Sequence, residues 1–235
     1  WKAQIYDQAP VGSGGGDSGL FNDVMDALQN GNAAILNNSY SLCEPGTCGD
    51  PKPEPRYSTI VRRAYANAYR MNVVSAASMG NSSDERTYYP SGFDQEALIA
   101  VGATNRNDSR ASFSTTGDHI DVSAPGRDIM STFPSGAFLS STCNDDNNDG
   151  YGLCSGTSMA SPHVAGIAGL LLAENPNLYN DDIEHIIRLS AEDIVDDSDP
   201  TTGPGFDEGT GAGRVNARDA LEYLQSPYAV KHWMA

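Results

Sequence analysis

The feature that most constrains the fold is the alternation of short apolar runs with longer amphipathic runs. Residues 98–103 form an apolar run of strand length, and residues 120–126 read as a short strand closed by a turn. Residues 59–70 have helical periodicity instead. Further strands are predicted over residues 3–6, 33–36 and 73–77, and further helices over 18–30, after 158, over 181–189 and over 216–224. Gly31 is expected to end the helix over 18–30 as its C′ residue. Such alternation predicts an α/β fold with a parallel sheet and crossover helices.

Length and charge narrow the function classes. A chain of 235 residues fits one domain. Its 14 Lys and Arg against 31 Asp and Glu give a net charge of −17, which argues against a nucleic-acid partner. No apolar run approaches the roughly 20 residues that span a bilayer. We therefore expect a protein with no nucleic-acid partner and no membrane span, and we expect it to be a monomer.

The four cysteines form two local pairs, Cys43 with Cys48 and Cys143 with Cys154. Four cysteines permit three connectivities, but each local pair brackets a loop rich in Gly, Pro or Asp. Local disulfides would indicate an oxidising compartment, so we expect a secreted, extracellular protein. The alternative, a zinc site, lacks both C-x-x-C spacing and a nearby histidine.

The run G-T-S-M-A-S-P-H-V-A-G, residues 156–166, places Ser158 between a glycine turn and an apolar helix start. Backbone N–H groups at a helix N-terminus point outward, and the helix dipole favours developing negative charge there. The pattern is typical of a presented nucleophile. It lacks the second glycine of the G-x-S-x-G elbow. The competing interpretation is a helix start of small residues inside a core.

The same run resembles the nucleophile motif of the subtilisin-like serine proteases, the subtilases. Other matching pieces follow in the family's order: N-N-S-Y at 37–40, A-S-M-G-N at 77–81, Y-P at 89–90, I-A-V-G-A at 99–103, A-S-F-S at 111–114 and A-P-G at 124–126. The resemblance implies a subtilisin-like three-layer α/β fold, with a mostly parallel sheet and helices on both faces. It further implies that residues 1–225 are a catalytic domain incomplete at its N-terminus, followed by a tail or linker, 226–235.

The resemblance also implies roles for individual residues. Ser158 would be the nucleophile and Asn81 an oxyanion donor, although an asparagine after Gly80 could instead serve only as a turn residue. Substrate would lie extended beside residues 39–41. The residues implied for substrate binding are Ser39, Tyr40, Ser41, Ala77, Ser78, Met79, Gly80 and Tyr88. Because Tyr88 is bulky and would lie at the floor of the first pocket, we expect a short pocket.

A general base is missing from this pattern. His163 lies five residues after Ser158, about 140° around the helix, and cannot reach its hydroxyl. His119 is expected in a loop, and His185 and His232 in solvent. Subtilases carry their aspartate in D-[ST]-G and their histidine in H-G-T-H-V. Asp17-Ser18-Gly19 follows glycines rather than a strand, so we interpret it as a helix cap.

We therefore expect the catalytic Asp and His upstream of residue 1, in a missing N-terminal segment of the same domain, and we expect this chain to be inactive alone. The predicted function is that of a secreted serine endopeptidase acting on polypeptides through a serine acyl-enzyme. One alternative is a non-catalytic, subtilase-like extracellular binding module.

A calcium loop is the last prediction. Asp145, Asn147 and Asp149 stand at alternate positions before Gly150, as in the opening D-x-N-x-D-G of a calcium loop. The twelfth position is Gly156 and not the usual Glu, so an acidic turn in solvent is the alternative. Calcium would be structural, with no cofactor for the chemistry. This loop alone would suggest a calcium-dependent extracellular interaction domain.

Overall fold

A parallel sheet of four strands lies at the centre of the computed structural model, which describes residues 4–5, 16–48, 50–93, 98–133, 143–144 and 150–225. The strand order is β1-β2-β3-β4. The register pairs Ile35 with Val74, Ser75 with Leu98, and Val101 with Val122. The strands are β1 (Ile35–Asn38), β2 (Val74–Ser78), β3 (Leu98–Thr104) and β4 (Val122–Pro125). The predicted parallel sheet is confirmed.

Both faces of this sheet are covered. Every residue of β2 and β3 is buried, as expected for parallel strands between two layers of helices. Val74 and Ala76 of β2 pack in one apolar cluster with Ile99 of β3, whereas Ala77 and Leu98 belong to a second cluster. The period of two along each strand thus separates these two clusters, and Ala100 packs with Met79 and Ile120 in a third, smaller one.

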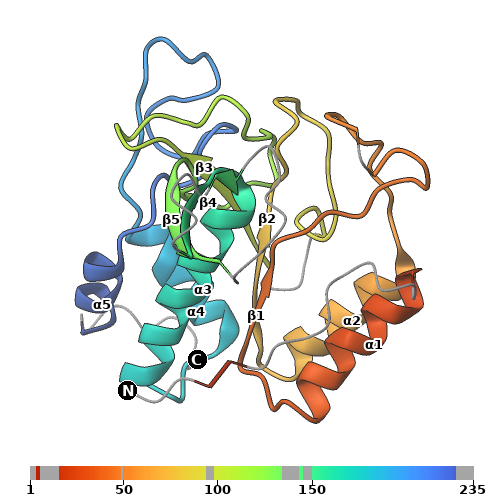
Figure 1. Cartoon of the computed structure of the whole chain (residues 1–235). Coiled ribbons are helices and arrows are strands. Elements are labelled where there is room, and N and C mark those ends of the chain that lie inside the picture. Colours follow the sequence, from red (N-terminus) through yellow and green to blue (C-terminus); the bar gives the residue numbers. More distant parts are fainter. Residues whose placement is uncertain are drawn as a thin grey trace.

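Helices form the outer layers (Figure 1). One layer holds α1 (Gly16–Gln29) and α2 (Thr59–Arg70). The other holds α3 (Thr157–Glu174), α4 (Asn180–Leu189) and α5 (Ala217–Gln225). Ser58 caps α2, accepting a hydrogen bond from the N–H of Val61 at 3.3 Å. The three-layer α/β architecture is therefore as expected.

A second, antiparallel sheet was not predicted. It has the order β5-β7-β6, with β5 (Ile129–Thr132), β6 (Cys143–Asn144) and β7 (Tyr151–Cys154). Met130 and Leu153 are paired across this sheet and exposed. Cys143 and Cys154 are register partners and form a disulfide.

The disulfide pairing is local, as expected. Besides Cys143 with Cys154, the structure joins Cys43 with Cys48. Since all four cysteines are in disulfides, the zinc interpretation is wrong. The predicted calcium ligands Asp145, Asn147 and Asp149 lie outside the described residues, as does the predicted tail 226–235.

Three local expectations at the start of the chain need correction. Gln4 and Ile5 are exposed and not in a strand; the rest of the predicted strand 3–6 lies outside the described residues. The left-handed residue after α1 is Asn32, with φ 48°, rather than Gly31. Asp17 is not a cap, because α1 already begins at Gly16 and the Asp17 carboxylate binds Arg56.

Within the described ranges, no helix combines the length and the apolar character that a membrane crossing requires.

Candidate active site

The carboxyl ends of β1 and β2 and the first turn of α3 meet at one edge of the main sheet. Ser39 follows β1, and Gly80 and Asn81 come shortly after β2. Gly80 has a φ of 109°, and a Cβ there would lie 3.1 Å from Thr115 Oγ1. Glycine is therefore required by both conformation and space. Ligand sites are expected at this edge of a parallel sheet.

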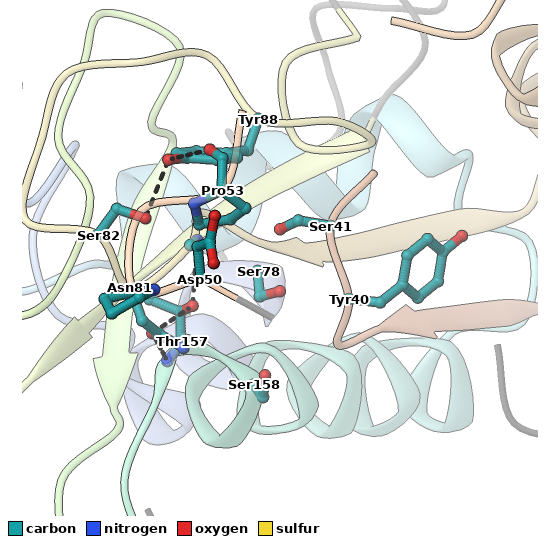
Figure 2. A pocket seen from close by; sticks show the side chains of 12 residues that line it. Tyr40, Ser41, Asp50, Pro53, Ser78, Asn81, Ser82, Tyr88, Thr157 and Ser158 are labelled. Atoms are coloured by element: carbon teal, nitrogen blue, oxygen red, sulfur yellow. Dashed lines mark hydrogen bonds between the residues drawn. The ribbon is translucent and has the colours of Figure 1, made fainter. Parts of the chain in front are cut away.

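Thr157 and Asn81 are joined by two hydrogen bonds beside Ser158, a pair called here the Asn81–Thr157 lock. The Asn81 Oδ1 accepts hydrogen bonds from the N–H of Thr157 at 2.8 Å and from its Oγ1 at 3.0 Å (Figure 2). The Thr157 Oγ1 in turn accepts from the N–H of Gly80 at 3.1 Å. These bonds fix the orientation of the Asn81 amide, and its Nδ2 donates to no acceptor among the described residues. Asn81 is exposed on the cavity side.

Ser158 is the second residue of α3 and is half-buried. Its Oγ donates to the C=O of Ser39 at 3.4 Å, a long hydrogen bond. In the first turn of a helix, the backbone N–H of such a residue has no intrahelical acceptor. Ser158 thus contributes a hydroxyl and a backbone donor to the cavity that Asn81 also lines.

Pro162 explains how Ser39 holds the nucleophile. A proline has no N–H, so the C=O four residues earlier, that of Ser158, has no intrahelical i+4 donor. The Ser39 Oγ donates to that C=O at 2.9 Å and supplies the missing bond. Proline in this motif thereby couples the helix start to the segment after β1.

Asn37 adds a second tie between β1 and α3. Its Oδ1 accepts from Ser161 Oγ at 2.8 Å, and its Nδ2 donates to Ser39 Oγ at 3.1 Å. These bonds orient the Ser39 hydroxyl towards Ser158. The sequence analysis assigned no role to Asn37 or Thr157, although both lie in motifs that match the family. Their roles could not be predicted because their hydrogen-bond partners are distant in the sequence.

Tyr40 is fixed from behind. Its hydroxyl contacts that of Tyr65, which donates to Asn38 Oδ1 at 2.7 Å, and Asn38 Nδ2 donates to the C=O of Ala76 at 3.0 Å. Burial raises the pKa of both tyrosines above the ordinary range, so both phenols stay protonated. The segment beside the nucleophile is therefore held rigidly.

A cavity of about 220 Å³ opens beside Ser158 (Figure 2). Ser41 and Ser78 line it along with Tyr40, Gly80 and Asn81. Of the other residues predicted to bind substrate, Tyr88 lines it, Ser39 instead binds Ser158, and Ala77 and Met79 are fully buried away from it. A loop missed by sequence reasoning completes the lining with Asp50, Pro51 and Pro53.

Tyr88 limits this cavity. Its side chain is 1% exposed, and its hydroxyl donates to Ser82 Oγ at 2.9 Å, close to the C=O of Pro53 at 3.2 Å. Burial raises the pKa of the Tyr88 phenol, which stays protonated at neutral pH. The ring is therefore pinned at its polar end.

None of the histidines in the described part of the chain lines the cavity. His163 is exposed, with Nδ1 2.8 Å from the C=O of Met159. His185 is exposed on α4, and His119 lies in a turn. His232 lies outside the described residues. The cavity thus combines a serine hydroxyl with backbone and amide donors but offers no imidazole.

Comparison with known proteins decides the family. The model of the subtilase family matches residues 1–213. This chain belongs to the subtilases. It is 32% identical over 220 residues to the M-protease of Shouchella clausii, an alignment that covers 93% of this chain and 48% of that protein. It is 35% identical over 167 residues to thermitase of Thermoactinomyces vulgaris, covering 69% and 49%.

Solved structures agree with the fold of this subtilase. The structure of fervidolysin from Fervidobacterium pennivorans, a keratinolytic enzyme related to subtilisin, matches with a TM-score of 0.69 and 28% identity. The match covers 88% of this chain and 29% of fervidolysin. The chain spans about half the length of the M-protease and thermitase sequences. Its relatives are serine proteases.

Proposed function

We propose that this subtilase chain carries the nucleophile and the oxyanion donors of a serine endopeptidase that acts on polypeptides outside the cell. The observation that carries the proposal is the Asn81–Thr157 lock beside Ser158, which leaves the Asn81 Nδ2 free to donate. Residues 1–225 form part of the catalytic domain, which is incomplete at its N-terminus, and residues 226–235 form a tail or linker in this proposal.

The chemistry is acyl transfer. The Ser158 Oγ attacks the scissile carbonyl carbon, and its proton passes to a histidine base. The carbonyl oxygen becomes an oxyanion, which the Ser158 N–H and the Asn81 Nδ2 stabilise. The amine then leaves with the proton, and water hydrolyses the resulting ester on Ser158.

The histidine and the aspartate that orients it come from outside these 235 residues in this proposal. Support comes from the cavity lining, which contains no imidazole, and from the exposed position of His163. Without a base, only the residual catalysis of binding and oxyanion stabilisation remains. The 235-residue chain alone would therefore be inactive.

Substrate binds extended along residues 39–41, and the side chain before the scissile bond enters the cavity. Tyr88, held by Ser82, closes this pocket early and disfavours large aromatic side chains. Backbone hydrogen bonding to an extended peptide gives broad recognition, and the pocket gives selectivity. Equal cleavage after phenylalanine and after alanine would contradict the short pocket.

The proposal is tested with a fluorophosphonate probe, which labels activated serines. The probe is applied to the longer polypeptide encoded by the gene and to the 235-residue chain, with a Ser158→Ala variant of each as control. We expect labelling at Ser158 in the longer polypeptide only, located by peptide mass spectrometry. An unlabelled longer polypeptide would favour the alternative, a non-catalytic extracellular binding module.

Calcium is a separate structural proposal. Asp145, Asn147 and Asp149 offer oxygen ligands at alternate positions between the disulfide-linked Cys143 and Cys154. Bound calcium raises the unfolding temperature because it binds only the folded loop. Calorimetric titration with Ca²⁺ is expected to give heat that Asp145→Asn reduces; neither heat nor a thermal shift would count against the site.

A further inference from the structure

The loop over residues 42–56, here the cystine loop, forms one wall of the cavity. A hydrogen bond from the N–H of Glu44 to the C=O of Glu54, at 2.8 Å, joins its two ends. The disulfide Cys43–Cys48 closes its first part. Near its tip, the N–H of Asp50 donates to the C=O of Thr47 at 2.9 Å. The described residues of the loop are thus held by internal bonds.

Asp50 projects from this loop into the cavity. Figure 2 shows its carboxylate between Tyr88 and Pro53 on one side and Ser78 and Asn81 on the other. The rest of the lining is uncharged: hydroxyls, one amide, prolines and two tyrosines. Among the described residues that line the cavity, Asp50 is therefore the one that carries a charge.

Several other acidic residues, among them Glu54 of the same loop, have arginine partners. Asp84 and Glu54 both pair with Arg86. Asp17 pairs with Arg56. By contrast, Asp50 forms no ion pair with any residue in the described ranges. Lys52 belongs to the same loop but does not line the cavity.

We infer that Asp50 makes this pocket select a positively charged side chain, that of lysine or its shorter analogue ornithine, at the residue whose carbonyl is attacked (P1). The inference rests on the proposed function, because it assigns the cavity to the P1 side chain. Tyr88 closes the floor, so a cation meets Asp50 at the wall. A glutamate of similar size is repelled there, and selectivity arises from both effects.

The test compares peptides that differ only at P1, with lysine, ornithine, alanine or glutamate. The longer polypeptide encoded by the gene is expected to give a higher kcat/KM for lysine and ornithine than for glutamate. Asp50→Asn is expected to lower the ratio of kcat/KM for the lysine peptide to that for the glutamate peptide by about tenfold. One exposed charge contact changes affinity by up to about fivefold, and the substitution removes both the attraction of lysine and the repulsion of glutamate. Raising NaCl from about 0.05 to about 1 M shrinks the ratio.

Glu44→Gln is the matched control. It removes the same charge from the same loop, and Glu44 is exposed and does not line the cavity. We expect the ratio to stay unchanged in this variant. Equal effects of Asp50→Asn and Glu44→Gln, or no effect of Asp50→Asn, would overturn the role of Asp50.

A binding measurement separates this inference from the proposed function. Fluorescent peptides with P1 lysine or glutamate are titrated into the Ser158→Ala variant, with and without Asp50→Asn, and Kd is read by fluorescence polarisation. Failure of the longer polypeptide encoded by the gene to hydrolyse any peptide would refute the proposed function and leave the ratio of the two Kd values measurable. Tighter binding of the lysine peptide, lost in Asp50→Asn, supports the inference; equal Kd values or no lysine-peptide binding would overturn it.

Discussion

The two walls of the cavity are built differently. The reactive wall, comprising Asn81, Thr157 and Ser158, stands on the end of β2 and the start of α3, and Thr157 is fully buried. The cystine loop contributes exposed residues, among them Asp50. Chemistry requires donors fixed to a fraction of an ångström, which packed elements provide. Selectivity is placed on a loop, whose sequence can change without disturbing the core.

The largest predicted effect breaks the reactive wall. Asn81→Ala removes the amide donor, and we expect kcat of the active polypeptide to fall by about 10² to 10³, the range found when such a donor is removed from a subtilase. KM should change little, because the bond forms chiefly in the transition state. Steady-state kinetics on a neutral peptide measure both constants.

Thr157→Val is the matched control for Asn81. It keeps the backbone N–H that binds Asn81 Oδ1 and removes only the hydroxyl bonds. A smaller loss of kcat is expected. If Thr157→Val were as damaging as Asn81→Ala, Asn81 would act through the local structure rather than as a donor.

A smaller effect tests the junction between Ser39 and the nucleophile. Ser39→Ala leaves the C=O of Ser158 without its donor, and we expect kcat to fall about tenfold. Pro162→Ala restores an N–H four residues after Ser158. In the double variant the loss should be smaller than the sum of the single losses in free energy. Strict additivity would show that the two residues act separately.

The smallest effect concerns an anchor of the cystine loop. Arg56 donates to the carboxylate of Asp17 on α1 and lowers its pKa, against the opposing effect of burial. A carboxyl whose pKa is lowered in the folded state stabilises that state at pH values above its ordinary pKa. This stabilisation is lost as the pH falls through the pKa of the folded state. Asp17→Asn should therefore lower the free energy of unfolding by about 1 kcal/mol at neutral pH and by almost nothing in strong acid. The effect at neutral pH is small because the ion pair is partly exposed.

Urea unfolding at several pH values measures this difference. Arg56→Gln and the double variant isolate the energy of the pair. A cost of Asp17→Asn that persists in strong acid would contradict the assignment to the ion pair. Kinetics on a neutral peptide should be unaffected, which would separate loop anchoring from chemistry.

Much of the fold could be predicted because its signals are local. The helix over residues 59–70 was predicted with the bounds that α2 shows, since its apolar period marks it. The sheet β5-β7-β6 was missed. Its strands have only two to four residues, and the apolar residues Met130 and Leu153 are exposed. The strands therefore show no alternation of buried apolar and exposed polar residues from which they could be predicted.

The site was predictable only in part. The helix start around Ser158 has a local pattern, and the family resemblance suggested Asn81. The Asp50 wall has no such pattern, because an aspartate in a proline-rich segment is typical of any exposed turn. Gly31 illustrates the same limit at smaller scale: Asn32 adopts the left-handed conformation instead, which asparagine tolerates.

By itself, the sequence determined the α/β class, the subtilase resemblance and the inability of His163 to serve Ser158, because each follows from residues close together in the chain. Tertiary structure alone decided which groups meet. It brings Ser39 to Ser158 across 119 positions and Asn81 to Thr157 across 76. Such contacts depend on the strand order and the crossover connections, which place distant segments at one edge of the sheet. The hydrophobic periodicity of the sequence does not reveal that order.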